Sequence, residues 1–418
     1  MPPMKASSIA APVGTVLSMI KTSLWLWSVR GGCERSWPRA IATHMAALGS
    51  NEMDGLRSLA VVSDSISGKR EQQRYQGLQA LRAIAATLVV VQHSVYYSLL
   101  AAGADTLAFR RLQLGTIGVF IFFVISGAVM ALATTKEGAP AFALSRLTRI
   151  YPAYFLALAL ASGVLAVAGV PPHLTLDASL LLLPTGDLNS SFNVPYWTLI
   201  YEVQFYFLLW LAALFRTSHA LRMWLAAAWA GIILIASVSG LVVPVLNPTA
   251  AQIPFAGVNL FFVLGYLVAS GMMTEDWRPF FTVVVITTLT SIFANAWSQS
   301  YLSLAVLCVS AVFIAIKTRA DLVPKWLVIA GDYSYGLYLF HLSIVYGLYS
   351  LAPGWPLGTM ILVTLFCGLS AGLAFGRFEQ WVYARYWRPI AKRAEAREDH
   401  PAGITVGTTL AVIQSDRR

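Results

Sequence analysis

The residues best suited to chemistry are Arg82 and His93, which lie eleven positions apart in one apolar segment. On a helix this spacing is roughly 20° past three full turns and about 16 Å of rise, so both side chains share a face. Such a pair could place a permanent cation where a phosphate-bearing donor enters and a neutral imidazole, acting as general base, deeper in the bilayer. In the alternative interpretation, Arg82 snorkels to the interface and His93 bonds a neighbouring helix.

A carboxylate follows in an aromatic segment, residues 193–206. Pro195 suits a helix start, Trp197 suits a membrane interface, and Tyr206 lies one helical turn after Glu202. Glu202 could orient or charge-stabilise a catalytic histidine, or bind sugar hydroxyls beside the aromatic rings. Its alternative is a protonated acid that is hydrogen-bonded to another helix.

A polar stripe interrupts the apolar segment near residues 333–352. Ser334, Tyr338 and His341 share one helical face there. A stripe of this kind predicts a lined cavity that binds substrate. An interhelical hydrogen-bond network without a catalytic role remains the alternative.

Two arginines, Arg146 and Arg149, are spaced i and i+3 at the predicted entrance to a span. This spacing puts both guanidinium groups on one side of a helix, where they could clamp a phosphate. Basic residues at a cytoplasmic helix end are also a common topological signal, so the pair alone has two explanations.

Composition indicates the elements that must position these residues. The 418 residues are 57% hydrophobic and only 11% charged, which argues against a soluble fold. The net charge of +10 comes from basic residues between apolar runs and at the two ends, so we predict no nucleic acid partner. The three cysteines are far apart and indicate neither a disulfide framework nor a metal site.

Long apolar segments recur from Leu78 onward, each about 20 residues and therefore long enough to cross a bilayer as a helix. We predict an all-α integral membrane bundle of about ten transmembrane helices. The segments lie near residues 78–100, 115–135, 150–170, 195–215, 221–243, 255–273, 279–296, 299–317, 333–352 and 357–378.

Basic residues predict the orientation, because cytoplasmic loops retain them. One set of alternate loops, together with the C-terminal tail, holds most of them, whereas the opposite set holds only Arg110 and Arg111. Both termini are therefore predicted to be cytoplasmic. The chain divides into a poorly ordered N-terminal arm (1–74), a membrane domain (75–386) and a basic C-terminal tail (387–418).

Several of these segments, in this order, resemble the acyltransferase-3 family of membrane O-acyltransferases, and most closely its exopolysaccharide-modifying, ExoZ-like members. The similarity runs from about Tyr75 to about Tyr386. The motifs that carry it are Leu81-Arg82 with His93, Gly118-Val119 with Phe122 to Gly127, Arg146 with Arg149 to Pro152, Trp197-Thr198-Leu199 with Glu202, Phe205 and Tyr206, and Tyr333 to Tyr335 with Tyr338-Leu339 and His341. The chain departs from the family at Phe120, where relatives often have an acidic residue, and at Ala128, where an aromatic residue is common.

The resemblance implies a cytoplasmic acyl-CoA donor, most simply acetyl-CoA, used as co-substrate without a bound cofactor. It also implies a glycan or lipid-linked sugar acceptor at the outer side of a bacterial cytoplasmic (inner) membrane. Essential roles are implied for Arg82, His93, Arg146 and Arg149.

The resulting hypothesis is an O-acyltransferase. His93, oriented by Glu202, removes a proton from a sugar hydroxyl, which attacks the thioester while the three arginines hold the CoA phosphates. Direct transfer and a covalent acyl-enzyme both remain open. The main alternative is a proton-coupled secondary transporter or flippase, against which the sequence shows no internal repeat. A non-catalytic membrane scaffold would leave the polar motifs unexplained.

Overall fold

The computed structural model describes residues 50–133, 138–170, 180–186, 195–293, 299–351 and 354–399. The chain forms two compact units, Met1–Arg70 and Glu71–Arg418. The described part of the first unit is a helix from residue 50 onward. All the candidate site residues belong to the second unit. The N-terminal arm and the C-terminal tail remain predictions, because 1–49 and 400–418 lie outside the described residues.

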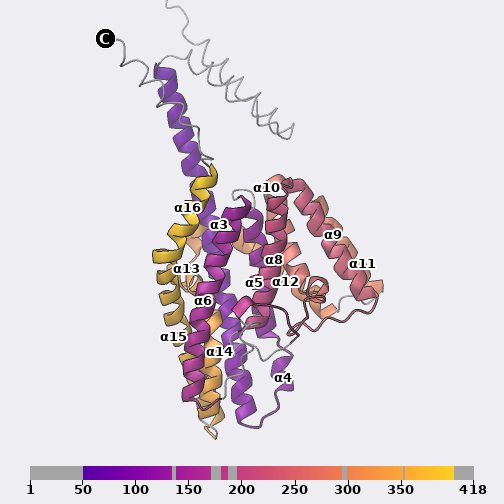
Figure 1. The fold of residues 1–418 in the computed structure, drawn as a ribbon, viewed down its shortest axis with the longest axis vertical. Coiled ribbons are helices and arrows are strands. Elements are labelled where there is room, and N and C mark those ends of the chain that lie inside the picture. Colours follow the sequence, from indigo (N-terminus) through magenta and orange to yellow (C-terminus); the bar gives the residue numbers. More distant parts are fainter. Residues whose placement is uncertain are drawn as a thin grey trace, which may run out of the picture. The chain divides into compact units, whose positions relative to one another are not determined.

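The second unit is built from helices (Figure 1). Its described residues contain no β-strand, only an isolated antiparallel bridge between Thr185 and Thr249. The helices are α3 (Ser50–Ala101, which begins in the first unit), α4 (Leu107–Arg110), α5 (Leu114–Ala133), α6 (Ala139–Val167), α8 (Tyr196–Leu214), α9 (His219–Val238), α10 (Asn259–Thr274), α11 (Arg278–Phe293), α12 (Gln299–Lys317), α13 (Lys325–Asp332), α14 (Ser334–Leu351), α15 (Leu357–Val382) and α16 (Arg388–Asp399). Short 3-10 turns η1 (Ile253–Phe255) and η2 (Ala320–Leu322) and a π-helical turn η3 (Tyr383–Trp387) join some of them.

The helices have the length and composition of an integral membrane protein. Six helical segments of the described chain are long and apolar enough to cross a membrane: Gln76–Ala101, Leu107–Ala133, Ala139–Val167, Tyr196–Leu214, His219–Val238 and Leu357–Ala394. Three further apolar helical stretches of the described chain are shorter, Asn259–Thr274, Arg278–Phe293 and Tyr301–Lys317. The all-α membrane class is therefore confirmed. The number of about ten spans and the cytoplasmic side of both termini stay predictions.

Two of the helix boundaries that differ from the sequence prediction affect the site. α6 begins at Ala139 instead of near 150, with Pro140 in its first turn, where proline is favoured. Arg146 and Arg149 therefore lie inside this helix and not at its entrance. α15 continues to Val382, beyond the predicted end at 378, so that Glu379 belongs to the same helix.

Glycines let the central helices approach closely. A Cβ at Gly265 of α10 would overlap the backbone of Val124 on α5, and one at Gly336 of α14 would overlap the backbone of Gly376 on α15. Small residues at such crossings are the usual means by which membrane helices pack, because there is no hydrophobic driving force between helices in lipid. α14 and α15 lie side by side in Figure 1. This packing fixes the positions of the polar residues that α14 and α15 carry.

Aromatic stacking fills the interior between α5 and α10. The Phe120 ring stacks on Phe261 at 4.0 Å between centroids, and the Phe123 ring stacks on Phe262 at 4.4 Å. Phe120 is therefore a packing residue, only 2% exposed.

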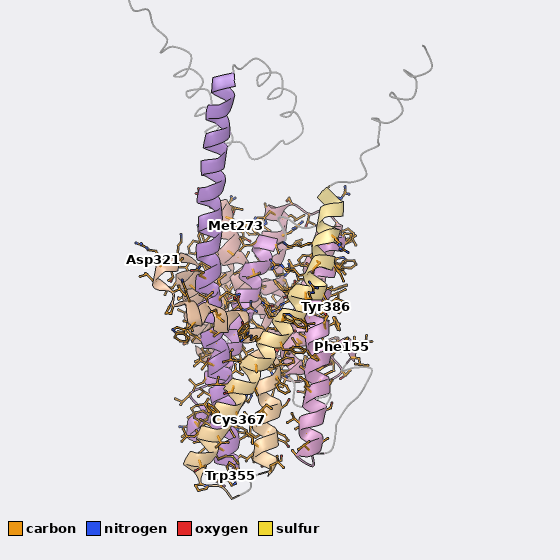
Figure 2. All side chains as sticks on the ribbon, turned by 90° about the vertical axis from the view of Figure 1, so that its left-hand side faces the viewer. Phe155, Met273, Asp321, Trp355, Cys367 and Tyr386 are labelled. Atoms are coloured by element: carbon orange, nitrogen blue, oxygen red, sulfur yellow. The ribbon has the colours of Figure 1, made fainter. Side chains whose placement is uncertain are left out.

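The two ends of the second unit can be followed in Figure 2. Met273, at the end of α10, and Asp321, in η2, lie toward one end, whereas Trp355, between α14 and α15, lies at the other. α14 runs toward the end that holds Trp355, because its last residue, Leu351, shortly precedes that tryptophan.

Candidate active site

Six of the predicted site residues line one cavity of about 150 Å³ in the interior of the helical unit. They come from α3, α6, α8 and α14, which are far apart in sequence. These residues are Arg82, Arg146, Arg149, Glu202, Tyr206 and Tyr338. We call this space the arginine cavity, since three of its lining residues are arginines.

Arg149 enters the arginine cavity as half of a buried ion pair. Its Nη1 atom lies 2.6 Å from Oε1 of Glu379 on α15, whose side chain is only 4% exposed. The guanidinium carbon also lies 4.9 Å from the ring centre of Tyr335 and 5.0 Å from that of Tyr383. A buried charge requires such compensation, so much of the Arg149 charge is already balanced by the protein.

Arg146 lies against two aromatic rings, and Arg82 is hydrogen-bonded to the side chain of Gln79. The Arg146 guanidinium carbon is 5.3 Å from the ring centre of Phe142 and 6.0 Å from that of Tyr206. Arg82 donates from Nη1 to Gln79 Oε1 at 3.4 Å. Stacking on rings keeps a guanidinium in place. Both arginines line the arginine cavity together with Arg149.

Glu202 faces the same cavity. Its Oε1 atom accepts hydrogen bonds from Tyr206 Oη at 2.5 Å and from Ser126 Oγ at 3.4 Å. Tyr206 lies one turn further along α8, as the spacing predicts. Glu202 is therefore fixed by hydroxyl donors next to the arginines.

The partner of His93 is a second histidine. Nδ1 of His93 lies 2.9 Å from Nε2 of His341 on α14, and their ring centres are 5.1 Å apart. His341 is fully buried, whereas His93 is partly exposed. The hypothesis that Glu202 orients His93 is not supported by this geometry, because among the described residues the ring of His93 is hydrogen-bonded to His341.

The hydrogen bonds of His341 determine which nitrogen of each neutral ring carries the proton. Nδ1 of His341 lies 3.0 Å from the backbone oxygen of Leu337, which can only accept, so Nδ1 is the donor. Nε2 of a neutral His341 is then an acceptor, and the proton between the rings belongs to Nδ1 of His93. Nε2 of His93 is left with a lone pair, the form that a general base needs.

Tyr338 connects the histidine pair with the arginine cavity. It lines the cavity, and its ring centre is 6.2 Å from that of His341. Its hydroxyl is 2.8 Å from Thr198 Oγ1 on α8, which also lines the cavity. Tyr338 therefore lies between the arginine cavity and His341.

Two predicted cavity residues have other surroundings. Trp197 packs edge-on against Tyr201 and Phe123. Ser334 is fully buried at the start of α14, beside the close contact between α14 and α15. Neither is among the residues that line the arginine cavity.

Sequence reasoning did not assign Glu379, Tyr335 and Tyr383, three of the residues that contact Arg149, to the site. Glu379 lay one residue beyond the predicted end of its apolar segment. Had that span been extended by one helical turn, Glu379 would have been an intramembrane acid and a candidate by the same argument as Glu202.

Comparisons with known proteins show the family of the chain. The model of the acyltransferase-3 family, described as an acyltransferase domain, matches residues 75–376. The chain is 31% identical over 232 residues to acyltransferase MdmB of Streptomyces mycarofaciens. That match covers 49% of this chain and 59% of MdmB, so the chain spans less than two thirds of the length of this relative. No solved structure matches. Both matches favour a transferase over a transporter, while the ExoZ-like subtype stays a prediction.

Proposed function

We propose, since the chain belongs to the acyltransferase-3 family, that it is a membrane O-acyltransferase that moves an acyl group from acyl-CoA to a sugar hydroxyl. The observation that carries this proposal is the histidine pair, with a lone pair on Nε2 of His93, next to a cavity lined by three arginines. A base beside an anion-binding cavity suits the deprotonation of an alcohol and the binding of a phosphorylated donor.

The donor is acyl-CoA, most simply acetyl-CoA, supplied from the cytoplasm. CoA is rich in phosphate, and arginine forks bind phosphate through paired, charge-assisted hydrogen bonds. Arg82 and Arg146 are assigned to the CoA phosphates. Arg149, balanced by Glu379, contributes mainly to the shape of the cavity.

The acyl transfer has two steps, addition of the acceptor hydroxyl to the thioester carbonyl and elimination of the CoA thiolate. Nε2 of His93 takes the proton of the acceptor hydroxyl as the oxygen attacks the thioester carbonyl carbon. The carbon–sulfur bond then breaks, and the CoA thiolate leaves and receives the proton from His93. Ester and CoA thiol are the products, and the histidine returns to its starting form.

His341 is a positioning residue in this scheme. It accepts from Nδ1–H of His93 and is itself held by Leu337, so that the base cannot adopt the wrong tautomer. A neutral acceptor serves this purpose, in the way that a carboxylate does in other catalytic dyads.

The acceptor is a glycan or lipid-linked sugar, presented at the outer side of a bacterial cytoplasmic membrane. The topology predicted from basic loops supports this assignment, because α3 would then run outward from Arg82 to His93.

The test is surface-glycan analysis by NMR and mass spectrometry in cells that lack the protein, complemented with wild type or with His93→Ala. An O-acyl signal restored only by wild type identifies the acyl group and the acceptor together. Normal acylation by His93→Ala, at equal protein in the membrane, would overturn the proposal. An unchanged acyl pattern with a solute trapped inside the cell would favour a transporter.

A further inference from the structure

Four tyrosines surround the far side of His93 from the arginine cavity. Tyr96 and Tyr97 follow His93 on α3, and Tyr346 and Tyr349 follow His341 on α14. We call them the tyrosine cluster, and all four side chains are partly exposed. We propose that the tyrosine cluster binds the sugar ring of the acceptor and presents its hydroxyl to His93, an inference that rests on the function proposed above.

Ring contacts make the tyrosines one unit. The centre of the Tyr97 ring lies 5.3 Å from Tyr96, 5.4 Å from Tyr346 and 5.6 Å from Tyr349. Tyr346 and Tyr349 are 5.7 Å apart. Edge-to-face and tilted contacts of this kind hold rings in fixed orientations. The tyrosine cluster is therefore a preformed aromatic surface that joins α3 and α14.

The tyrosine cluster touches the catalytic base directly. The Tyr97 ring centre lies 6.5 Å from the ring centre of His93, and Tyr97 follows His93 by about one helical turn. A molecule seated on the tyrosines would thus reach His93 from the side opposite the arginines. Tyr346 and Tyr349 contact Tyr97 but are not in ring contact with His93, so they can be changed without altering the base itself.

The hydroxyl groups of the four tyrosines indicate which class of ligand the tyrosine cluster would bind. None of the four tyrosine hydroxyls is hydrogen-bonded to another residue in the described part of the chain. Tyrosine hydroxyls that are partly buried normally find a partner. A sugar offers both an apolar ring face for the aromatic rings and several hydroxyls for the phenols, whereas a lipid chain would leave the phenols unpaired.

Along both α3 and α14, the histidine lies between a residue of the arginine cavity and a residue of the tyrosine cluster. α3 carries Arg82, then His93, then Tyr97, with His93 about 16 Å beyond Arg82 and Tyr97 about 6 Å beyond His93. α14 carries Tyr338 at the arginine cavity, then His341, then Tyr346 toward the end that holds Trp355 (Figure 2). The base thus lies between a site for charge and a site for hydroxyls.

The test uses the full chain in membrane vesicles from producing cells, with radiolabelled acetyl-CoA as donor and the endogenous glycan as acceptor. The double variant Tyr346→Leu/Tyr349→Leu removes the rings, and Tyr346→Phe/Tyr349→Phe removes only the hydroxyls. We expect transfer of label to carbohydrate to fall roughly tenfold with the leucines and about threefold with the phenylalanines. The KM for acetyl-CoA should stay within twofold of wild type, which also reports that the donor site is folded.

Tyr386→Leu is the matched control, because this exposed tyrosine lies in η3, where its ring contacts Trp381. Wild-type transfer by both double variants would overturn the inference, as would a parallel rise in the KM for acetyl-CoA or label recovered in lipid instead of carbohydrate. If wild-type vesicles transfer no more label than His93→Ala vesicles, the proposed function itself is contradicted. The two failures are therefore distinguishable.

Discussion

The arginine cavity and the tyrosine cluster lie on the two sides of the histidine pair, and their polar groups differ in charge and in hydrogen bonding. In the arginine cavity the polar groups are charged, and each is held by a partner: Arg149 by Glu379, Arg146 by two rings and Glu202 by two hydroxyls. In the tyrosine cluster the groups are uncharged, and their hydroxyls have no bonding partner among the described residues. One side is suited to a charged donor and the other to a polyhydroxyl acceptor.

The difference follows from the cost of placing charge in a bilayer. A guanidinium or carboxylate within the membrane must be paired or solvated, so the arginine cavity carries its own counter-charges. An unpaired phenol costs less free energy than an unpaired ion, so tyrosine hydroxyls near an interface need no partner within the protein. Changes at the arginine cavity should therefore alter stability as well as donor binding, whereas changes at the tyrosine cluster should alter acceptor use alone.

Apart from loss of the base His93 itself, the largest effect is expected at its hydrogen-bond partner, His341. His341→Ala should lower kcat by about 100-fold, because His93 loses the acceptor that fixes its tautomer. The KM values for donor and acceptor should change little. His341→Gln, whose amide oxygen can accept from Nδ1–H, should recover much of the rate. An equal loss of rate in both variants, or a rise in either KM, would contradict a positioning role.

Next in size is the buried ion pair, which should distinguish the arginine cavity as a stabilised site. Glu379→Ala leaves Arg149 without its counter-charge and should lower the free energy of unfolding by about 3 kcal/mol, measured by SDS titration in detergent micelles. The matched control is Asp276→Asn, which breaks an exposed ion pair with Arg278. Hydrogen bonding from Arg278 holds the pKa of Asp276 below its usual value, but solvent screens this pair, so we expect no measurable change. Equal free energies of unfolding for Glu379→Ala and Asp276→Asn would contradict the claim that the buried ion pair stabilises the protein more than the exposed one.

A smaller effect is expected at Arg146, which lines the arginine cavity. Arg146→Ala should raise the KM for acetyl-CoA roughly tenfold, with little change in acceptor use, because a phosphate contact is lost. Arg146→Lys should lie between this variant and wild type, since it keeps the charge but not the planar fork. Initial rates at varied donor concentration give both values, with Arg278→Ala as an exposed control. A KM for acetyl-CoA that Arg146→Ala leaves unchanged would contradict the assignment of this arginine to the donor.

The smallest effect is expected at Phe120, which belongs to neither side. Phe120→Leu should lower the free energy of unfolding by about 1 kcal/mol, because the stack on Phe261 is lost. Acyl transfer should stay within twofold of wild type, since Phe120 does not line the arginine cavity. A large loss of transfer at normal stability would mean that the site extends further into α5 than the cavity indicates.

Much of the arginine cavity could be predicted from the sequence, because polar residues in apolar segments are few. Arg82, Glu202 and Tyr338 were identified on that ground alone, and they do line one cavity. Glu379 was missed because the predicted span ended one residue too early. Helix ends depend on packing and caps, which hydropathy alone does not resolve.

Contacts between distant segments could not be predicted in this way. His93 and His341 are 248 residues apart, and only the packing of α3 and α14 brings their rings together. Reasoning from the sequence paired His93 with Glu202 and did not identify its contact with His341. Tyr97 and Tyr346 have the positions expected of an interfacial aromatic belt, so periodicity offered no reason to group them.

The central claim is that His93 is the base between the arginine cavity and the tyrosine cluster. The most direct test measures transfer of radiolabelled acetyl from acetyl-CoA to carbohydrate in vesicles that carry wild type, His93→Ala or His219→Ala. His219, on α9, contacts Tyr266 and lies outside both sites, so it is the matched histidine. We predict that His93→Ala lowers transfer by at least about 1,000-fold while His219→Ala transfers like wild type. Comparable transfer by His93→Ala and wild type would contradict the account.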